Sequence, residues 1–301
     1  MAGSKISIYS ALAANILIAA TKFIAGNFTR SSSMIAEGVH SLVDTTNQLL
    51  LLYGLKQSKK RPDLLRPFGY GKELYFWSFI VAIMIFGLGG GISIYQGYRH
   101  VVEPEPLTDP FWNYIVLGAS LIFEGISFIL ALKAFNKIRG EEPWWQSIIN
   151  SKDPTSFLIL FEDGAAVLGL LIVWICLYLE HLLNNPYLDG IASILVGILL
   201  MFVSLILARE SRSLLMGEGI AKKTERHVRQ LLLQDPAIIS VRNIFSTYES
   251  PEEILLVLII TVQNGLDTSE IHETITSART RIKNTFPIIK FVIIQPEEVN
   301  L

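Results

Sequence analysis

The chain has 301 residues, 51% of them hydrophobic, and a formal net charge of −2 at pH 7. A charge this close to zero gives no reason to expect a nucleic-acid partner. The single cysteine, Cys176, excludes a disulfide within this chain and a thiolate metal cluster.

Six apolar runs occupy roughly the first 210 residues, and each is about as long as the 20 or so residues that cross a bilayer. They cover residues 6–28, 32–55, 74–98, 111–135, 155–180 and 187–208. The first run lacks a small-residue cleavage site, so we expect it to remain as an anchor. The sequence therefore predicts a polytopic α-helical membrane protein with a six-helix transmembrane domain over residues 1–210.

Basic residues are concentrated in alternate loops between these runs. After the second run lie Lys56, Lys59, Lys60, Arg61, Arg66 and Lys72, and after the fourth lie Lys133, Lys137, Arg139 and Lys152. The loops after the third and fifth runs are richer in acidic residues. Loops rich in lysine and arginine stay in the cytoplasm, so we expect both termini there.

Small residues four apart occur in two of the runs. Gly87 and Gly91 form a GxxxG pair in the third run, and Ala165 and Gly169 form a weaker version in the fifth. Such spacing lets helix backbones approach each other closely. Ordinary filling of a membrane helix by small residues is the alternative for each pair.

The second run contains "EGVHSLVDTTNQ", which places polar groups where a bilayer makes them costly. Helical spacing puts them on one face, as a stripe of Glu37, His40, Asp44, Asn47 and Gln48. His40 and Asp44 can reach one ion, and an imidazole with a carboxylate suits Zn²⁺, with Fe²⁺, Co²⁺ and Mn²⁺ as alternatives. Two ligands are too few for a tetrahedral site, so others must come from another helix or from water.

Further polar groups lie in the other apolar runs. The fifth run offers Glu162 and Asp163, which point about 100° apart on a helix, so only one can face the stripe squarely. Glu124 in the fourth run and Asn15 in the first are additional candidates, for which a structural hydrogen bond is the alternative. Glu37 lies nearer the outer end of its run and could line an exit path or only be hydrated.

Residues 211–301 are predicted to form a small cytoplasmic α+β domain. Its expected elements are helix 224–237, strands 238–249 and 253–262, helix 267–286 and strand 288–294. Asp267 followed by Glu270 predicts a capping box at the start of the second helix. The order αββαβ predicts one ferredoxin-like sheet with helices on one face. His227 and His272 lie on these helices, where a surface role is simpler than a metal site.

The HxxxD pair of His40 and Asp44, the six spans and the αββαβ tail resemble the cation diffusion facilitator family. Three segments extend the resemblance over nearly the whole chain: "RPFGYGKEL" (66–74), "SLLMGEG" (213–219) and "DPTSFLILFEDGAAVLG" (153–169). The last is similar to the branch that includes zinc transporter 9 and many bacterial relatives.

The resemblance implies a homodimeric carrier, not an enzyme, that exports divalent cations from the cytoplasm in exchange for protons. Zn²⁺ is the favoured ion, and no cofactor besides the transported cation is implied. We expect the carrier to lie in the lipid bilayer of a bacterial plasma membrane, with both termini in the cytoplasm.

The family's central metal site takes two ligands from the second span and two from the fifth. By resemblance His40 and Asp44 match the first pair, and Asp163 matches the aspartate of the second. The remaining position is Ile159, which cannot bind a metal, so Glu162, Asn47 or a water is expected to replace it.

Accessory sites of the family are expected to be absent or altered here. Arg66 and Tyr70 occupy loop positions where many members carry histidines, and the tail "IIQPEE" lacks another. Lys72 matches a lysine that joins charges near the dimer interface in some members, with Glu210 or Glu218 as its expected partner.

Protons and metal would compete for the same atoms, because binding needs a neutral imidazole and ionised carboxylates. An unperturbed histidine has a pKa of about 6.5, so His40, Asp44 and Asp163 are the expected proton carriers. An intramembrane protease and a cation channel are the alternative classes of function. The sequence contains no HExxH motif, which an intramembrane zinc protease would need. A specific His/Asp site favours a carrier over a cation channel.

Overall fold

The computed structural model describes residues 2–104, 111–139, 143, 147 and 152–297. Within these ranges the side chains of residues 2–14, 138 and 156 lie outside the description. The chain divides into two compact units, residues 1–55 with 76–211 and residues 56–75 with 212–301.

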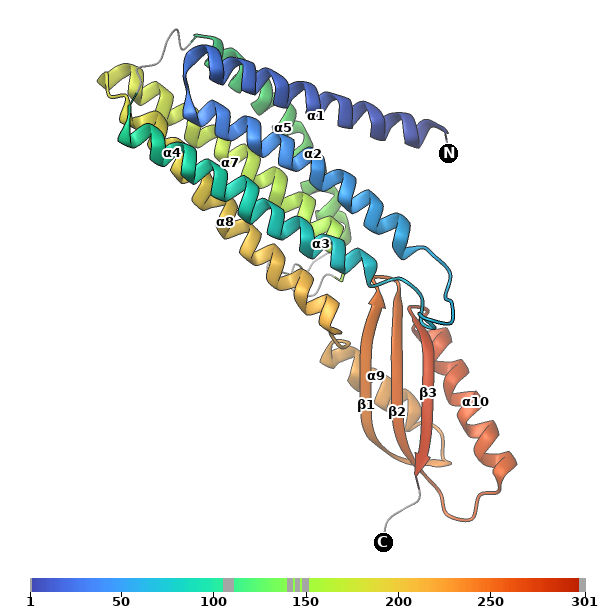
Figure 1. The fold of residues 1–301 in the computed structure, drawn as a ribbon. Coiled ribbons are helices and arrows are strands. Elements are labelled where there is room, and N and C mark those ends of the chain that lie inside the picture. The colour runs from blue at the N-terminus through green and yellow to red at the C-terminus, as the bar shows by residue number, and fades with distance from the viewer. Residues whose placement is uncertain (1, 105–110, 140–142, 144–146, 148–151, 298–301) are drawn as a thin grey trace. The chain divides into compact units, whose positions relative to one another are not determined.

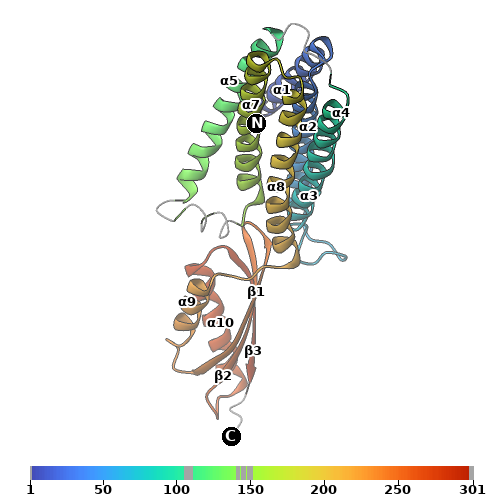
Figure 2. The same ribbon diagram turned by 90° about the vertical axis from the view of Figure 1, so that its left-hand side faces the viewer.

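The first unit is built from long helices that run side by side (Figures 1 and 2). They are α1 (Ala2–Thr29), α2 (Ser32–Ser58), α3 (Glu73–Met84), the π-helix η1 (Ile85–Gly91), α4 (Ile92–Val102), α5 (Phe111–Arg139), α7 (Pro154–Leu183) and α8 (Tyr187–Met216). Local chemistry sets the ends of α7. The Asp153 side chain accepts a hydrogen bond from the Thr155 amide at its start, and Asn184 closes it with a φ of 48°. Asparagine tolerates this left-handed conformation better than most residues, so the boundary is encoded locally.

Four segments are long and apolar enough to cross a membrane, namely Glu73–Val102, Phe111–Lys137, Phe157–Leu183 and Tyr187–Met216. The chain is therefore a membrane protein, and four of the six predicted spans are confirmed. Helix α2 has 27 residues, but its polar stripe lowers its hydropathy. The first part of α1 falls outside the described side chains. Both remain predictions as spans.

Glycines bring the backbones of the third and sixth predicted spans into contact. A Cβ atom at Gly97 would lie 2.5 Å from the Gly190 carbonyl oxygen, and one at Gly197 would lie 2.8 Å from the Gly90 oxygen. In contrast, a Cβ at Gly87 would meet no described atom within 4 Å. Within one chain the close approach is made by glycines seven residues apart, whereas the alternative of ordinary helix filling fits Gly87.

Substituting Gly97 by alanine should destabilise the protein, whereas the same change at Gly87 should not. The added methyl group at Gly97 would press on a backbone oxygen, and overpacking of this kind costs about 1–3 kcal/mol. Thermal unfolding of the purified protein, followed by tryptophan fluorescence, would measure the difference. Equal melting temperatures for Gly97→Ala and wild type would contradict the contact.

The second unit has the predicted order αββαβ, with α9 (Lys222–Leu232), β1 (Ile238–Ser250), β2 (Glu253–Val262), α10 (Thr268–Thr285) and β3 (Ile289–Glu297). Strand β2 is central, antiparallel to β1 and parallel to β3. Val228 of α9 and Ile282 of α10 join the same buried core as Leu256 and Leu258 of β2, so both helices cover one face of the sheet (Figure 1). The predicted architecture of this unit is confirmed.

The start of α10 confirms the predicted capping box. The Glu270 amide donates to Asp267 Oδ1, and the Asp267 amide donates to Glu270 Oε2, each at 2.8 Å. The segment 56–75 packs within the same unit, because the Phe68 ring meets Phe291 of β3 edge to face at 5.4 Å. The loop that links α2 to α3 is therefore part of the sheet unit.

Candidate metal-binding site

The predicted stripe on α2 faces the interior of the helical unit. His40 and Asn47 are buried, and Asp44 is partly buried. On α7 both Glu162 and Asp163 are buried, with 5% and 7% of their surface exposed. The two helices thus present acidic groups to a region that water does not reach freely.

Glu162 is the α7 residue that contacts the stripe. Its Oε1 accepts a hydrogen bond of 2.5 Å from Asn47 Nδ2. On α2 itself, Gln48 Nε2 donates a hydrogen bond of 3.3 Å to Asp44 Oδ2. Asn47 thus joins α2 to α7 beside Asp44.

Asp163 faces a different helix, as its position next to Glu162 on the helix predicts. Its Oδ2 accepts a hydrogen bond of 2.7 Å from Ser127 Oγ of α5. Among the described residues no group of three or more His, Cys, Asp or Glu side chains is close enough to hold a metal ion. His40, Asp44 and Asp163 as joint ligands remain a prediction, and so does the role of Glu162.

The remaining candidates take three different positions. Glu124 of α5 is partly buried and lies within electrostatic reach of Asp44 and Asp163, so it faces the same interior. Asn15 is partly buried on α1. Ile159 is 38% exposed and carries no ligand atom, so it cannot complete a metal site.

Lys22 of α1 is a buried charged residue that the sequence analysis missed. Its Nζ lies 3.1 Å from Glu37 Oε2 and donates a hydrogen bond of 2.8 Å to Ser41 Oγ. Neither Lys22 nor Glu37 has any exposed side-chain surface. A single lysine in the middle of a predicted span is itself a signal of function, and it was available in the sequence.

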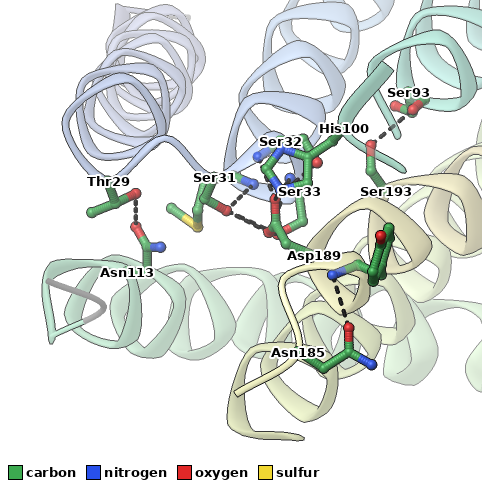
Figure 3. A network of polar contacts seen from close by, with 12 residues as sticks. Thr29, Ser31, Ser32, Ser33, Ser93, His100, Asn113, Asn185, Asp189 and Ser193 are labelled. Carbon is green, nitrogen blue, oxygen red and sulfur yellow. Dashed lines mark hydrogen bonds and ion pairs between the residues drawn. The ribbon is translucent and has the colours of Figure 1, made fainter. Parts of the chain in front are cut away.

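A second polar network surrounds Asp189 at the start of α8 (Figure 3). Its Oδ2 accepts from the amide and the hydroxyl of Ser32, at 2.5 and 2.8 Å, and its Oδ1 accepts from Ser31 Oγ at 2.6 Å. The amide and hydroxyl of Ser33 also donate to it, and His100 Nε2 lies 3.8 Å from Oδ2. A carboxylate at a helix N-terminus pairs with the free amides and the positive end of the helix dipole. Asp189 thus caps α2 and ties it to α8.

Replacing Asp189 by alanine should lower the stability by at least about 2 kcal/mol, since α2 loses its cap and buried hydroxyl groups lose an acceptor. The matched control is Asn185→Ala, because the Asn185 side chain accepts a single exposed hydrogen bond among the described residues, from the Tyr187 amide. Thermal unfolding in detergent would compare the two. A loss no greater than that of the control would refute the capping role.

The two loop positions at which the family often carries histidines are occupied by Arg66 and Tyr70, which take part in a polar network. Tyr70 donates a hydrogen bond of 2.5 Å to Asp63 Oδ2, and the Arg66 guanidinium lies 4.4 Å from the centre of the Tyr70 ring. Arg66 also pairs with Glu73 at 3.0 Å. Ion pairing, a cation–π contact and a hydrogen bond thus order the loop.

Lys72 Nζ, at the end of this loop, lies 3.6 Å from Glu249 Oε1 of β1. Glu249 is a partner that the sequence analysis did not consider, because the loop and β1 are far apart in the chain. Glu218 contacts Ser213 at 3.4 Å. A pairing of Lys72 with Glu210 stays a prediction.

The hydrogen bond from Tyr70 lowers the pKa of Asp63, with smaller contributions from the amides of Arg66 and Leu65. Because the pKa of Asp63 is lowered, the contact stabilises the loop at pH values above the ordinary carboxyl pKa of about 4. This stabilisation is lost as the pH falls through the lowered pKa of the folded state. Tyr70→Phe should therefore raise the pKa of Asp63 toward its ordinary value. An NMR titration of aspartate carboxyl carbons would measure it, and an unchanged Asp63 titration would show that the hydrogen bond is absent in solution.

Long apolar helices around buried acidic groups, followed by an αββαβ unit, define a membrane protein that handles cations. Residues 8–216 match the family described as "Cation efflux transmembrane domain", and residues 220–299 match "Cation efflux protein, cytoplasmic domain". The chain belongs to the cation diffusion facilitator family, whose members are secondary transporters and not enzymes. The predicted family is thereby confirmed, and the second unit is its cytoplasmic domain.

The names of relatives within the family refer to different metals. The chain is 35% identical over 228 residues to the mitochondrial "Proton-coupled zinc antiporter SLC30A9" of Xenopus laevis, covering 75% of this chain and 41% of that protein. It is 35% identical over 240 residues to "Metal tolerance protein C4" of Arabidopsis thaliana, covering 79% and 52%. It is 25% identical over 290 residues to "Manganese efflux system protein MneP" of Bacillus subtilis, covering 94% and 92%. The chain thus spans only about half or less of the length of the first two relatives.

Proposed function

We propose that this protein exports divalent transition-metal cations, Zn²⁺ in first place, from the cytoplasm in exchange for protons. The observation that carries the proposal is the set of buried acidic groups that α2 and α7 share in a cation efflux domain, with Glu162 of α7 hydrogen-bonded to Asn47 of the stripe that bears His40 and Asp44. A divalent cation bound between carboxyl groups of the two helices would displace the protons that they carry. Residues 1–210 would form the transport domain and residues 211–301 the cytoplasmic domain.

His40, Asp44 and Asp163 are the proposed ligands, and Glu162 takes the place of the ligand that Ile159 lacks. Glu162 suits this role because it already faces α2, where Asn47 holds its Oε1. Asp163 would have to leave Ser127 to join them, so binding requires α2 and α7 to shift relative to each other. Such rocking of helices around a mid-membrane site is the usual basis of alternating access.

Competition between the cation and protons would couple the two fluxes. A site open to the cytoplasm would bind the cation and release protons, and a site open outward would do the reverse. Exchange of one divalent cation for one proton would move positive charge outward, against about 2.3 kcal/mol per charge per 100 mV. Exchange for two protons would be electrically silent, and His40 with one carboxyl group could carry both.

The metal preference follows from the donor atoms. One imidazole with carboxylates favours Zn²⁺, whereas a set richer in oxygen shifts the preference toward Mn²⁺. The names of the relatives include both metals, zinc for SLC30A9 and manganese for MneP. Fe²⁺ and Co²⁺ complete the series to be tested.

The proposed location is the plasma membrane of a bacterium, with both termini in the cytoplasm. The alignment with MneP of Bacillus subtilis covers nearly the full length of both chains, while the mitochondrial relative is more than twice as long as the matched part. A homodimer is proposed because residues 220–299 match the cytoplasmic domain of the family.

The proposal predicts saturable Zn²⁺ transport driven by a pH gradient in proteoliposomes, with Mn²⁺, Fe²⁺ and Co²⁺ compared under the same gradient. Transport should fall about 100-fold in each of the variants His40→Ala, Asp44→Ala and Asp163→Ala, since each removes a direct ligand. Glu162→Ala should have a similar effect if it replaces the fourth ligand.

The matched control is His272→Ala, which removes an exposed histidine of α10. Normal transport by the three ligand variants would overturn the site. Fast, non-saturating flux that ignores the pH gradient would identify a channel instead of a carrier.

A further inference from the structure

Lys22 and Glu37 form an ion pair that leaves one carboxylate oxygen without a partner. Glu37 Oε2 lies 3.1 Å from Lys22 Nζ, but Glu37 Oε1 is buried and has no hydrogen-bond partner among the described residues. A Cβ atom at Gly169 of α7 would lie 3.0 Å from Oε1. The free oxygen therefore faces the one position on that part of α7 that has no side chain.

A buried acceptor without a partner is costly, at about 1–3 kcal/mol or more for a charged group. Asp189 shows how the same unit satisfies a carboxylate that serves only structure, because both of its oxygens accept two or more hydrogen bonds. Glu37 is half satisfied by comparison. The difference leaves Glu37 Oε1 available to a ligand.

The position of Glu37 places this oxygen on the route of the cation. Glu37 lies on the same face of α2 as His40 and Asp44, one turn closer to the end of the helix that is away from Lys56. Its charge and that of Lys22 both act on His40. Given the proposed orientation, this is the exit side of the site.

We propose that Glu37 is a second binding station for the exported divalent cation and that Lys22 is its resident substitute. The inference rests on the proposed function. The Lys22 ammonium neutralises Glu37 while no metal ion is there, and it yields the carboxylate when a cation leaves His40 and Asp44. Lysine suits an exchange of this kind, since it is a point charge on a flexible stem and can fall back on Ser41.

Lys22 would also keep the second station weak. A fixed positive charge beside Glu37 repels a divalent cation, and transport requires that an ion bind well enough to enter and weakly enough to leave. Without Lys22, Glu37 would hold the cation longer. Transport would then slow although binding became stronger, whereas loss of a purely structural ion pair would slow transport without strengthening binding.

The test compares Lys22→Met, Glu37→Gln and the double variant in Zn²⁺ binding by calorimetry and in Zn²⁺/H⁺ exchange in proteoliposomes. Lys22→Met should bind Zn²⁺ more tightly, or bind an additional equivalent, and transport it about 10- to 100-fold more slowly. The double variant has no buried unpaired charge, so it should fold. It should lose the additional binding and still transport slowly.

A charge-swapped variant, Lys22→Glu with Glu37→Lys, distinguishes a cation-binding role of Glu37 from a purely structural ion pair. A structural pair would be restored by the swap, whereas a cation station would not, because a lysine would then stand on the stripe of α2. Wild-type transport by the swapped or the double variant would overturn the proposal. So would unchanged Zn²⁺ binding in a folded Lys22→Met protein.

Failure of this inference can be told apart from failure of the proposed function. If wild type shows no Zn²⁺/H⁺ exchange, the function is wrong, and the calorimetry of Lys22→Met still decides whether Glu37 binds a cation. If wild type exchanges normally and the double variant matches it, only the station is wrong.

Discussion

The cost of removing charge from water governs the helical unit. An ionised group in an apolar bundle must find a partner, and each partner fixes how two helices meet. Glu162 meets Asn47, Asp163 meets Ser127, Glu37 meets Lys22, and Asp189 meets the N-terminus of α2. Helix α2 takes part in three of these four contacts. Its place among α1, α7 and α8 is therefore set by polar groups, while the apolar surface mainly faces outward.

The same constraint separates structure from transport. Asp189 is saturated with donors, so any departure from its present partners would leave several groups unsatisfied. Glu162 and Asp163 have fewer partners and lie on adjacent residues that serve different neighbours, α2 and α5. A rotation of α7 could exchange these partners at little cost. The network at Asp189 thus provides a fixed point, and the acidic pair on α7 provides the part that can change.

Local patterns were sufficient for much of the fold. The order αββαβ, the capping box of Asp267 and Glu270 and the buried stripe of α2 all follow from spacing along a few residues, and the structure agrees with each. The glycine contact does not follow from the GxxxG spacing, for a physical reason. Gly87 and Gly91 lie in the π-helix η1, where hydrogen bonds run from i to i+5, so residues four apart do not share a face as they do in an α-helix. The partners of Lys72 and Asp189 are distant in the chain, and no periodicity reveals them.

The assignment of the α2–α3 loop to the sheet unit has a mechanical consequence. The chain passes between the two units three times, after residues 55, 75 and 211. Three backbone connections between two domains restrict the chain more than one connection does. One of the three is a direct continuation of α2. The backbone of the sheet unit therefore continues directly into the helix that bears His40 and Asp44.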